Sequence, residues 1–175
     1  IHEQDGRRVL DSRRWGLIPF WAKEGGRGMI NARSETVSEK PSFRHAFSKR
    51  RCLIPSSGFY EWEKTENGKQ PWFISGKHQP LVFAGIWEQW KSPEGFPVKT
   101  CAILTCEANE VMAPFHHRMP VILQEKERNI WLDPQPKLDL KSLLRPCSQE
   151  LLQAWPVSSR VNRPVFNEPD CFAPI

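Results

Sequence analysis

The chain has 175 residues, a length typical of one domain with a substantial core. It has no run of 18 apolar residues, which argues against a transmembrane helix, and no basic-then-apolar leader, so we expect no signal peptide. The net charge is +5, but residues 1–55 hold 12 Lys and Arg against 6 Asp and Glu, an excess that attracts phosphate or simply forms a solvated basic face.

Sixteen prolines spread through the chain predict short elements. In the first third we expect a strand at 13–17, a glycine-rich loop at 19–28 and an extended segment at 29–37. The spacing of Phe43, Ala46 and Phe47 predicts a helix over 42–49, with Ser42 as its cap.

The rest of the sequence alternates further strands with short helices. Residues 59–65 and 70–75 flank Glu66-Asn67-Gly68-Lys69, and Asn-Gly between two aromatic-rich runs predicts a β-hairpin. The other expected strands are 51–55, 81–90, 99–108 and 119–123, with a helical turn at 109–115, helices at 125–132, 138–144 and 149–155, and a strand or loop at 155–162. The sum is one α+β domain with an antiparallel core of at least six strands and short peripheral helices.

The five cysteines do not indicate a metal site or a disulfide framework. Their odd number and irregular spacing favour reduced thiols in a cytosolic or nuclear compartment. Cys101 and Cys106 with His116 and His117 invite a zinc interpretation, but the pairs lack the spacing of zinc ligands. We therefore expect core cysteines and no metal. The sequence also lacks a P-loop and a nucleophile elbow.

Glu61 stands between Tyr60 and Trp62 in the stretch FYEWEKTENGKQPWF. Alternation along a strand places Glu61 on the face opposite these two aromatics. It is either a solvent-facing strand residue or a partly desolvated carboxylate with a raised pKa, suited to general acid or base chemistry.

Two further polar stretches are candidates for a site. His116, His117 and Arg118 lie together at the junction between a turn and an apolar strand, where binding residues often occur. Asn31-Ala32-Arg33-Ser34-Glu35-Thr36 has a similar character, because a buried Asn and Arg would need partners, and a phosphate or sugar could supply them. Eight tryptophans serve either core packing or the stacking of unpaired bases.

Taken together, these stretches resemble one protein family. The matching motifs occur in order over residues 15–162: WGLIPFW (15–21), NARSET (31–36), RCLIPSSGFYEW (51–62), QPWFI (70–74), FAGIWE (83–88), ILTCEAN (103–109), HHRMPVIL (116–123) and WPVSSRVN (155–162). They look like the SOS response-associated peptidase (SRAP) domain of abasic-site processing proteins. Each motif is weak alone, but the set in register is specific.

The resemblance implies a β-barrel-like core, a basic cleft for single-stranded DNA and covalent capture of abasic sites. In the family, an N-terminal cysteine forms a Schiff base with the abasic aldehyde, which closes to a thiazolidine. Self-cleavage and DNA lyase activity are associated with it. The resemblance implies that Asn31 orients the nucleophile, that Glu61 and His116 are catalytic, that Arg33 binds phosphate and that Trp21 packs against bases.

The sequence departs from the family pattern at its start. It opens with IHEQDGRRVL and has no Met-Cys-Gly-Arg, so none of the five cysteines is expected to be the nucleophile. The sequence is either part of a longer protein or a degenerate member without crosslinking chemistry, and its start favours the first, with an N-terminal segment missing. His117 stands where many members have Asp. A non-covalent DNA-binding module and a peptidase remain alternatives.

The expected partner is single-stranded DNA containing abasic sites, with no membrane, metal or cofactor. We expect a monomer, located in the cytoplasm with the nucleoid if the protein is bacterial and in the nucleus if it is eukaryotic.

Overall fold

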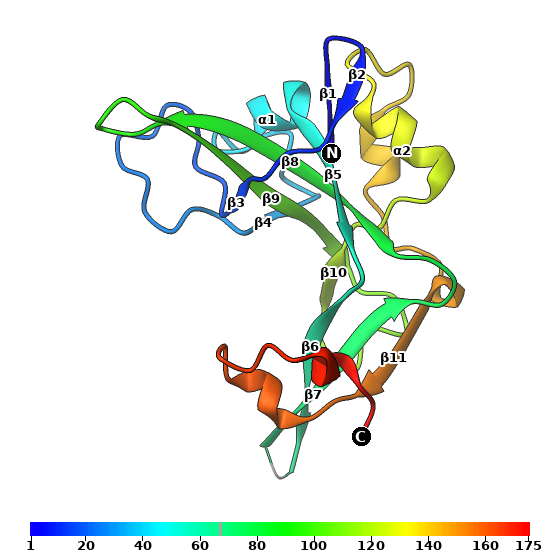
Figure 1. Cartoon of the computed structure of the whole chain (residues 1–175). Helices are drawn as coiled ribbons and strands as arrows, with labels where there is room; N and C mark the ends of the chain where they lie inside the picture. The colour runs from blue at the N-terminus through cyan, green and yellow to red at the C-terminus, as the bar shows by residue number, and fades with distance from the viewer. Residues whose placement is uncertain (67) are drawn as a thin grey trace. The chain divides into compact units, whose positions relative to one another are not determined.

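The computed structural model describes residues 1–66 and 68–175 and shows an α+β fold (Figure 1). The chain forms two compact units. The first comprises Ile1–Pro55, Val82–Cys106 and Pro120–Arg145, and the second comprises Ser56–Leu81, Glu107–Met119 and Pro146–Ile175. The predicted class, with mainly antiparallel strands and short helices, is confirmed. No helix among the described residues has the length and apolarity needed to cross a bilayer.

The larger sheet has the strand order β10-β9-β8-β5-β1-β2, with β3 and β4 paired to β9. Its strands are β1 (His2–Gln4), β2 (Arg7–Val9), β3 (Arg14–Trp15), β4 (Asn31–Arg33), β5 (Arg51–Ser56), β8 (Leu81–Lys91), β9 (Pro97–Glu107) and β10 (Arg118–Pro120). The sequence did not predict the β1–β2 hairpin, which turns at Asp5-Gly6 with positive φ at both residues. It also did not predict that β3 and β4 run parallel to β9.

Two short α-helices pack in the first unit. Helix α2 (Glu125–Leu132) has the predicted bounds, and its fully buried Trp131 donates from Nε1 to the Cys52 carbonyl at 3.0 Å. Helix α1 (Arg44–Lys49) begins two residues later than predicted. The predicted cap by Ser42 is wrong, because Phe43 occupies the N-cap position and turns its side chain into the core.

The buried guanidinium of Arg51 connects the C-terminal ends of both helices to β5. It donates hydrogen bonds to four main-chain carbonyls, those of Phe47, Ser48, Trp131 and Asp133. The last carbonyls of a helix have no partner within the helix and carry partial negative charge. Burial lowers the pKa of Arg51, and the charge of Asp133 opposes that shift. One cation therefore satisfies two helix ends at once.

Replacing Arg51 with Met should lower the free energy of unfolding by about 3 kcal/mol, because it leaves four carbonyls without their charged donor. Urea denaturation measures the change. The matched control is Arg44→Met on the exposed surface of α1, which should stay within about 0.5 kcal/mol of the unmodified protein. Equal midpoints for Arg51→Met and the unmodified protein would contradict this role.

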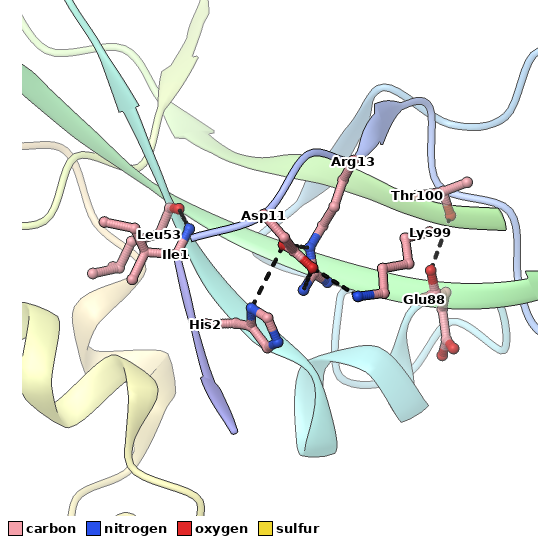
Figure 2. Close-up of polar contacts among 8 residues, drawn as sticks. All are labelled: Ile1, His2, Asp11, Arg13, Leu53, Glu88, Lys99 and Thr100. Atoms are coloured by element: carbon pink, nitrogen blue, oxygen red, sulfur yellow. Dashed lines mark hydrogen bonds and ion pairs between the residues drawn. The ribbon is translucent and has the colours of Figure 1, made fainter. Parts of the chain in front are cut away.

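Asp11 ties the segment after the β1–β2 hairpin to the sheet (Figure 2). Its carboxylate accepts hydrogen bonds from Arg13 Nε at 2.9 Å and Lys99 Nζ at 2.8 Å, and His2 Nδ1 lies 3.7 Å away. Burial acts to raise the pKa of Asp11, but the bonds from Lys99 and Arg13 outweigh it and lower the pKa to about 2. The Arg13 guanidinium also lies 3.8 Å from the ring centroid of Trp87. The network fixes the chain just before β3.

The second unit contains a three-stranded antiparallel sheet with the order β11-β7-β6. Its strands are β6 (Gly58–Thr65), β7 (Gly68–Gly76) and β11 (Leu152–Pro156). The predicted hairpin pairing of the two aromatic runs is confirmed, with Thr65 opposite Gly68, while the predicted turn residue Asn67 lies outside the described residues.

The last third of the chain contains the short 3-10 helices Leu140–Leu143, Gln149–Leu151, Ser159–Asn162 and Pro169–Phe172. The first lies within the helix predicted at 138–144, and the last two were not predicted as helices. The helix predicted at 149–155 is wrong, because Leu152–Pro156 pairs with β7 and buries Leu152 beside Gly76. The final residues (red in Figure 1) cross the β6–β7 hairpin, where Tyr60 Oη donates to the Cys171 carbonyl at 3.1 Å.

Candidate functional site

Glu61 lies in the middle of β6, and the hairpin separates it from the two aromatics beside it in the sequence. Tyr60 pairs with Phe73, and their ring centroids are 5.2 Å apart. Trp62 donates from Nε1 to Asn162 Oδ1 at 2.8 Å. Glu61 is opposite Trp72 in the register and therefore shares the other face of the hairpin with it. The predicted alternation is confirmed.

The Glu61 carboxylate is only half-buried, and its surroundings favour the protonated form. Burial raises its pKa, while the charge of His116 and a hydrogen bond from the Trp62 backbone oppose that shift. The solvated and the desolvated interpretations were both open from the sequence. The structure favours the second, because desolvation is the largest effect on this carboxylate.

His116 ends a tightly hydrogen-bonded series of turns that starts at Asn109. Asn109 Oδ1 accepts from the backbone of the fully buried Met112, and Asn109 Nδ2 donates to the Cys147 carbonyl at 3.1 Å. The Met112 carbonyl then accepts from the backbone N–H groups of both Phe115 and His116 at 3.0 Å. The hydrogen bonds of Asn109 at the start of these turns and of the Met112 carbonyl at their end thus both restrain the backbone at His116.

The Nδ1 atom of His116 lies between two backbone groups of Arg118. The Arg118 N–H is 2.9 Å from Nδ1, and the Arg118 carbonyl is 3.1 Å from it. Neutral Nδ1 can accept from the first group, and protonated Nδ1 can donate to the second. The ring therefore keeps a partner in either state, and Nε2 is the nitrogen suited to exchange a proton with a ligand. His117 stacks on this ring, with centroids 4.4 Å apart.

Asn31 and Arg33 lie in the first unit, on β4. They alternate with the buried Ala32, so both exposed side chains lie on the same face of the strand. Parallel pairing places Asn31 beside Ile103 and Arg33 beside Thr105 on β9. An amide and a guanidinium on one exposed strand face can bind a phosphate or a sugar hydroxyl.

Trp21 belongs to the loop between β3 and β4, and 54% of its surface is exposed. Two close contacts between backbone segments constrain this loop. A Cβ at Gly16 would lie 2.4 Å from the Arg27 carbonyl oxygen, and one at Gly28 would lie 2.2 Å from the Gly16 carbonyl oxygen. Both glycines have positive φ, so the loop requires glycine at each position. The Ala22 carbonyl also accepts from Trp90 Nε1 at 2.6 Å.

The predicted site residues divide between the two units. Glu61 and His116 come together in the second unit, whereas Trp21, Asn31 and Arg33 belong to the first. The first unit holds 19 Lys and Arg against 12 Asp and Glu, and the second holds 6 against 8. The acid–base candidates therefore belong to the unit with a slight acidic excess, and the candidates for phosphate and base contact belong to the basic unit.

The cysteines are free, as predicted, and four of the five are buried. Burial raises the pKa of Cys52 to about 12 and also raises the pKa of Cys101, which makes both poor nucleophiles. Within the part of the chain that the structure describes, no three or more His, Cys, Asp or Glu side chains group in a way that could hold a metal ion.

Sequence reasoning missed Trp72, Phe115 and Glu63, which accompany Glu61 and His116. The Trp72 ring lies 5.0 Å from the Phe115 ring, and Trp72 Nε1 donates to Glu63 Oε2 at 2.9 Å. Pairing Thr65 with Gly68 and counting back along the hairpin puts Trp72 opposite Glu61. The register was therefore a usable signal for Trp72, but nothing in the sequence pattern pointed to Phe115.

A family model described as SOS response associated peptidase (SRAP) matches residues 1–164. The chain belongs to the SRAP family. The "Abasic site processing protein YoqW" of Bacillus subtilis (strain 168) is 47% identical over 168 residues, which cover 92% of this chain and 75% of YoqW. The "Abasic site processing protein HMCES" of Gallus gallus is 36% identical over 197 residues, which cover 96% of this chain and 58% of HMCES.

SRAP membership agrees with the three-dimensional similarity. A crystal structure of a protein from Bacteroides thetaiotaomicron superposes with a TM-score of 0.86 at 34% identity, covering 92% of this chain and 75% of that one. The resemblance drawn from the motifs is thus confirmed at the level of family and fold. The roles of individual SRAP-like residues in this chain stay predictions.

Replacing His116 with Gln should raise the pKa of Glu61 further, because it removes the charge that opposes desolvation. Carboxyl-carbon NMR titration of labelled glutamate measures the midpoint. In the unmodified protein this midpoint should already lie above that of an ordinary glutamate. His78→Gln, at an exposed histidine of the same unit, is the control and should leave the midpoint in place. An unchanged Glu61 midpoint in His116→Gln would contradict the electrostatic interaction between the two residues.

Proposed function

We propose that this SRAP protein processes abasic sites in single-stranded DNA, with Glu61 and His116 as its acid–base groups. The observation that carries the proposal is the half-buried carboxylate in electrostatic range of a histidine whose Nδ1 has backbone partners. The names of its relatives, abasic site processing proteins at 36–47% identity, support abasic sites as the substrate.

The basic unit supplies the groups for DNA contact in this proposal. Arg33 binds a backbone phosphate, and Trp21 stacks against a base next to the lesion. Such contacts suit an abasic site, because the lesion has no base whose edge could be read. Asn31 lies on the same strand face as Arg33 and would hydrogen-bond the sugar or the group that attacks it.

Proton transfer is the chemistry that Glu61 and His116 can provide. An abasic sugar is mostly a closed ring, so its ring oxygen must gain a proton before the aldehyde is released. His116 can donate that proton from Nε2 while Nδ1 keeps its Arg118 partner. Glu61 accepts a proton from the attacking amine or thiol, and its raised pKa suits a base that must later return the proton.

The covalent step needs an amine and a thiol that the family takes from an N-terminal cysteine. The amine adds to the aldehyde and loses water to give a Schiff base, and the thiol sulfur then adds to the imine carbon to close a thiazolidine. Four of the five cysteines in residues 1–175 are buried, which makes them poor candidates for this nucleophile. We propose that residues 1–175 supply DNA binding and proton transfer, and that none of their cysteines is the nucleophile. DNA lyase and self-cleaving activities would depend on the N-terminal cysteine.

A second candidate is a non-covalent module that binds unpaired DNA. The basic excess of the first unit and the exposed Trp21 favour it equally well. The two candidates differ in one respect, because a binding module needs neither Glu61 nor His116.

The full-length natural protein, incubated with a single-stranded oligonucleotide bearing one abasic site, should form a heat-stable adduct on a denaturing gel. Glu61→Gln and His116→Gln should each slow its formation about 100-fold, the usual scale of general acid–base catalysis, with DNA affinity kept within about twofold. Glu66→Gln, an exposed carboxylate in the same hairpin, is the control. If no adduct forms although the gene encodes Met-Cys at its start, covalent processing is wrong. If the protein still binds the oligonucleotide in that case, the non-covalent binding module is the remaining candidate.

DNA affinity should fall steeply with salt, because phosphate contacts release counterions. Arg33→Ala should reduce the slope of log K against log salt by about one, the value for one lost phosphate contact. Fluorescence anisotropy at several salt concentrations gives the slope. Arg163→Ala, an exposed arginine of the other unit, is the control and should not change it. A slope near zero would contradict DNA as the partner.

A further inference from the structure

The Trp72–Phe115 contact joins the two segments of the second unit that carry Glu61 and His116. Trp72 lies on β7, and Phe115 lies in the turns after Asn109, 43 positions further along the chain. Their ring centroids are 5.0 Å apart with an interplanar angle of 40°. Tilted aromatic pairs at this distance are attractive beyond simple burial. This contact holds the turn against the sheet.

On the sheet side, the orientation of the Trp72 indole is fixed by Glu63. Trp72 is opposite Glu61 in the register, and Glu63 lies two residues further along β6, on the same face. The hydrogen bond from Trp72 Nε1 to Glu63 Oε2, at 2.9 Å, directs the indole along this face. The ring is thereby held beside Glu61 and is one of the groups that can exclude water from it.

On the turn side, the position of Phe115 determines that of His116. The two residues are adjacent, and their backbone N–H groups share the Met112 carbonyl at 3.0 Å each. The shared acceptor holds the two backbone N–H groups in a fixed relation to each other. We therefore expect a displacement of the Phe115 backbone, once its ring loses the contact with Trp72, to displace His116 as well.

We infer that Trp72 is a positioning residue, which holds Phe115 and with it the His116 turn so that the imidazole stays in electrostatic range of Glu61. It acts through Phe115 and Glu63 and needs no contact with substrate. The inference rests on the proposed function only for its catalytic consequence. The positioning itself is a property of the protein without DNA.

The test measures, in DNA-free full-length protein, how far His116→Gln moves the Glu61 carboxyl titration midpoint. The shift should be present in the unmodified background and lost in the Trp72→Leu background. Trp72→Phe keeps a ring against Phe115 but loses the bond to Glu63, so most of the shift should return. Phe115→Leu breaks the contact from the turn side and should also abolish the shift, which keeps the test decisive if Trp72→Leu fails to fold.

Trp155→Leu is the matched control. Trp155 lies on β11 of the same sheet, opposite Phe73 in the register, on the face away from Glu61. It also has a ring contact, with Phe73 at 5.4 Å, and an Nε1 bond, to the Phe172 carbonyl at 2.8 Å. Trp155→Leu should lower stability as Trp72→Leu does but keep the His116-dependent shift. A shift that persists in both Trp72→Leu and Phe115→Leu overturns the inference.

A second readout connects positioning to function. In single-turnover adduct formation, Trp72→Leu should reduce the rate about tenfold with unchanged DNA affinity, because a misplaced catalytic group slows the chemical step. A rate equal to that of Trp155→Leu overturns the catalytic consequence. If no variant forms an adduct while the titration coupling depends on Trp72, the proposed function fails and the positioning stands.

Discussion

The candidate site depends on the partial desolvation of one carboxylate, that of Glu61, opposed by one histidine. Burial makes ionisation of Glu61 unfavourable, and the charge of His116 makes it favourable. The balance leaves the group able to accept and return a proton, provided that His116 stays in place. Three residues restrain the turn that ends at His116: Asn109 and the buried Met112 through hydrogen bonds, and Phe115 through its ring contact with Trp72.

The two faces of strand β6 have different surroundings. On one face, Tyr60 and Trp62 bond to the C-terminal residues, while on the other Glu61 lies with Trp72 and Glu63. The candidate residues also divide between the two units. The basic unit contains Arg33 and Trp21, which suit phosphate and base contact, and the second unit, with its slight acidic excess, contains Glu61 and His116.

Local sequence patterns predicted much of the fold. The helical pattern of residues 125–132 predicted α2 with its observed bounds, the Asn-Gly signal predicted the pairing of the two aromatic runs, and strand alternation predicted the face on which Glu61 lies. They failed where a long-range partner decides the conformation. Residues 149–155 have an apolar pattern compatible with a helix, but pairing with β7 makes Leu152–Pro156 a strand. The parallel pairing of β3 and β4 with β9 and the Trp72–Phe115 contact join segments far apart in the chain, and no local pattern encodes them. Asn31 and Arg33 were candidates from their residue types, but their roles and that of Trp21 came from motif resemblance, which identifies residues without giving their geometry.

The central claim is that Glu61 and His116 act as one acid–base unit. A double-mutant cycle on single-turnover adduct formation with an abasic-site oligonucleotide tests it most directly, using Glu61→Gln, His116→Gln and the combined variant. Groups that act as a unit have strongly non-additive effects. We predict that the double variant is about as slow as the slower single variant. Losses that multiply would show that the two residues act independently, and would contradict the account.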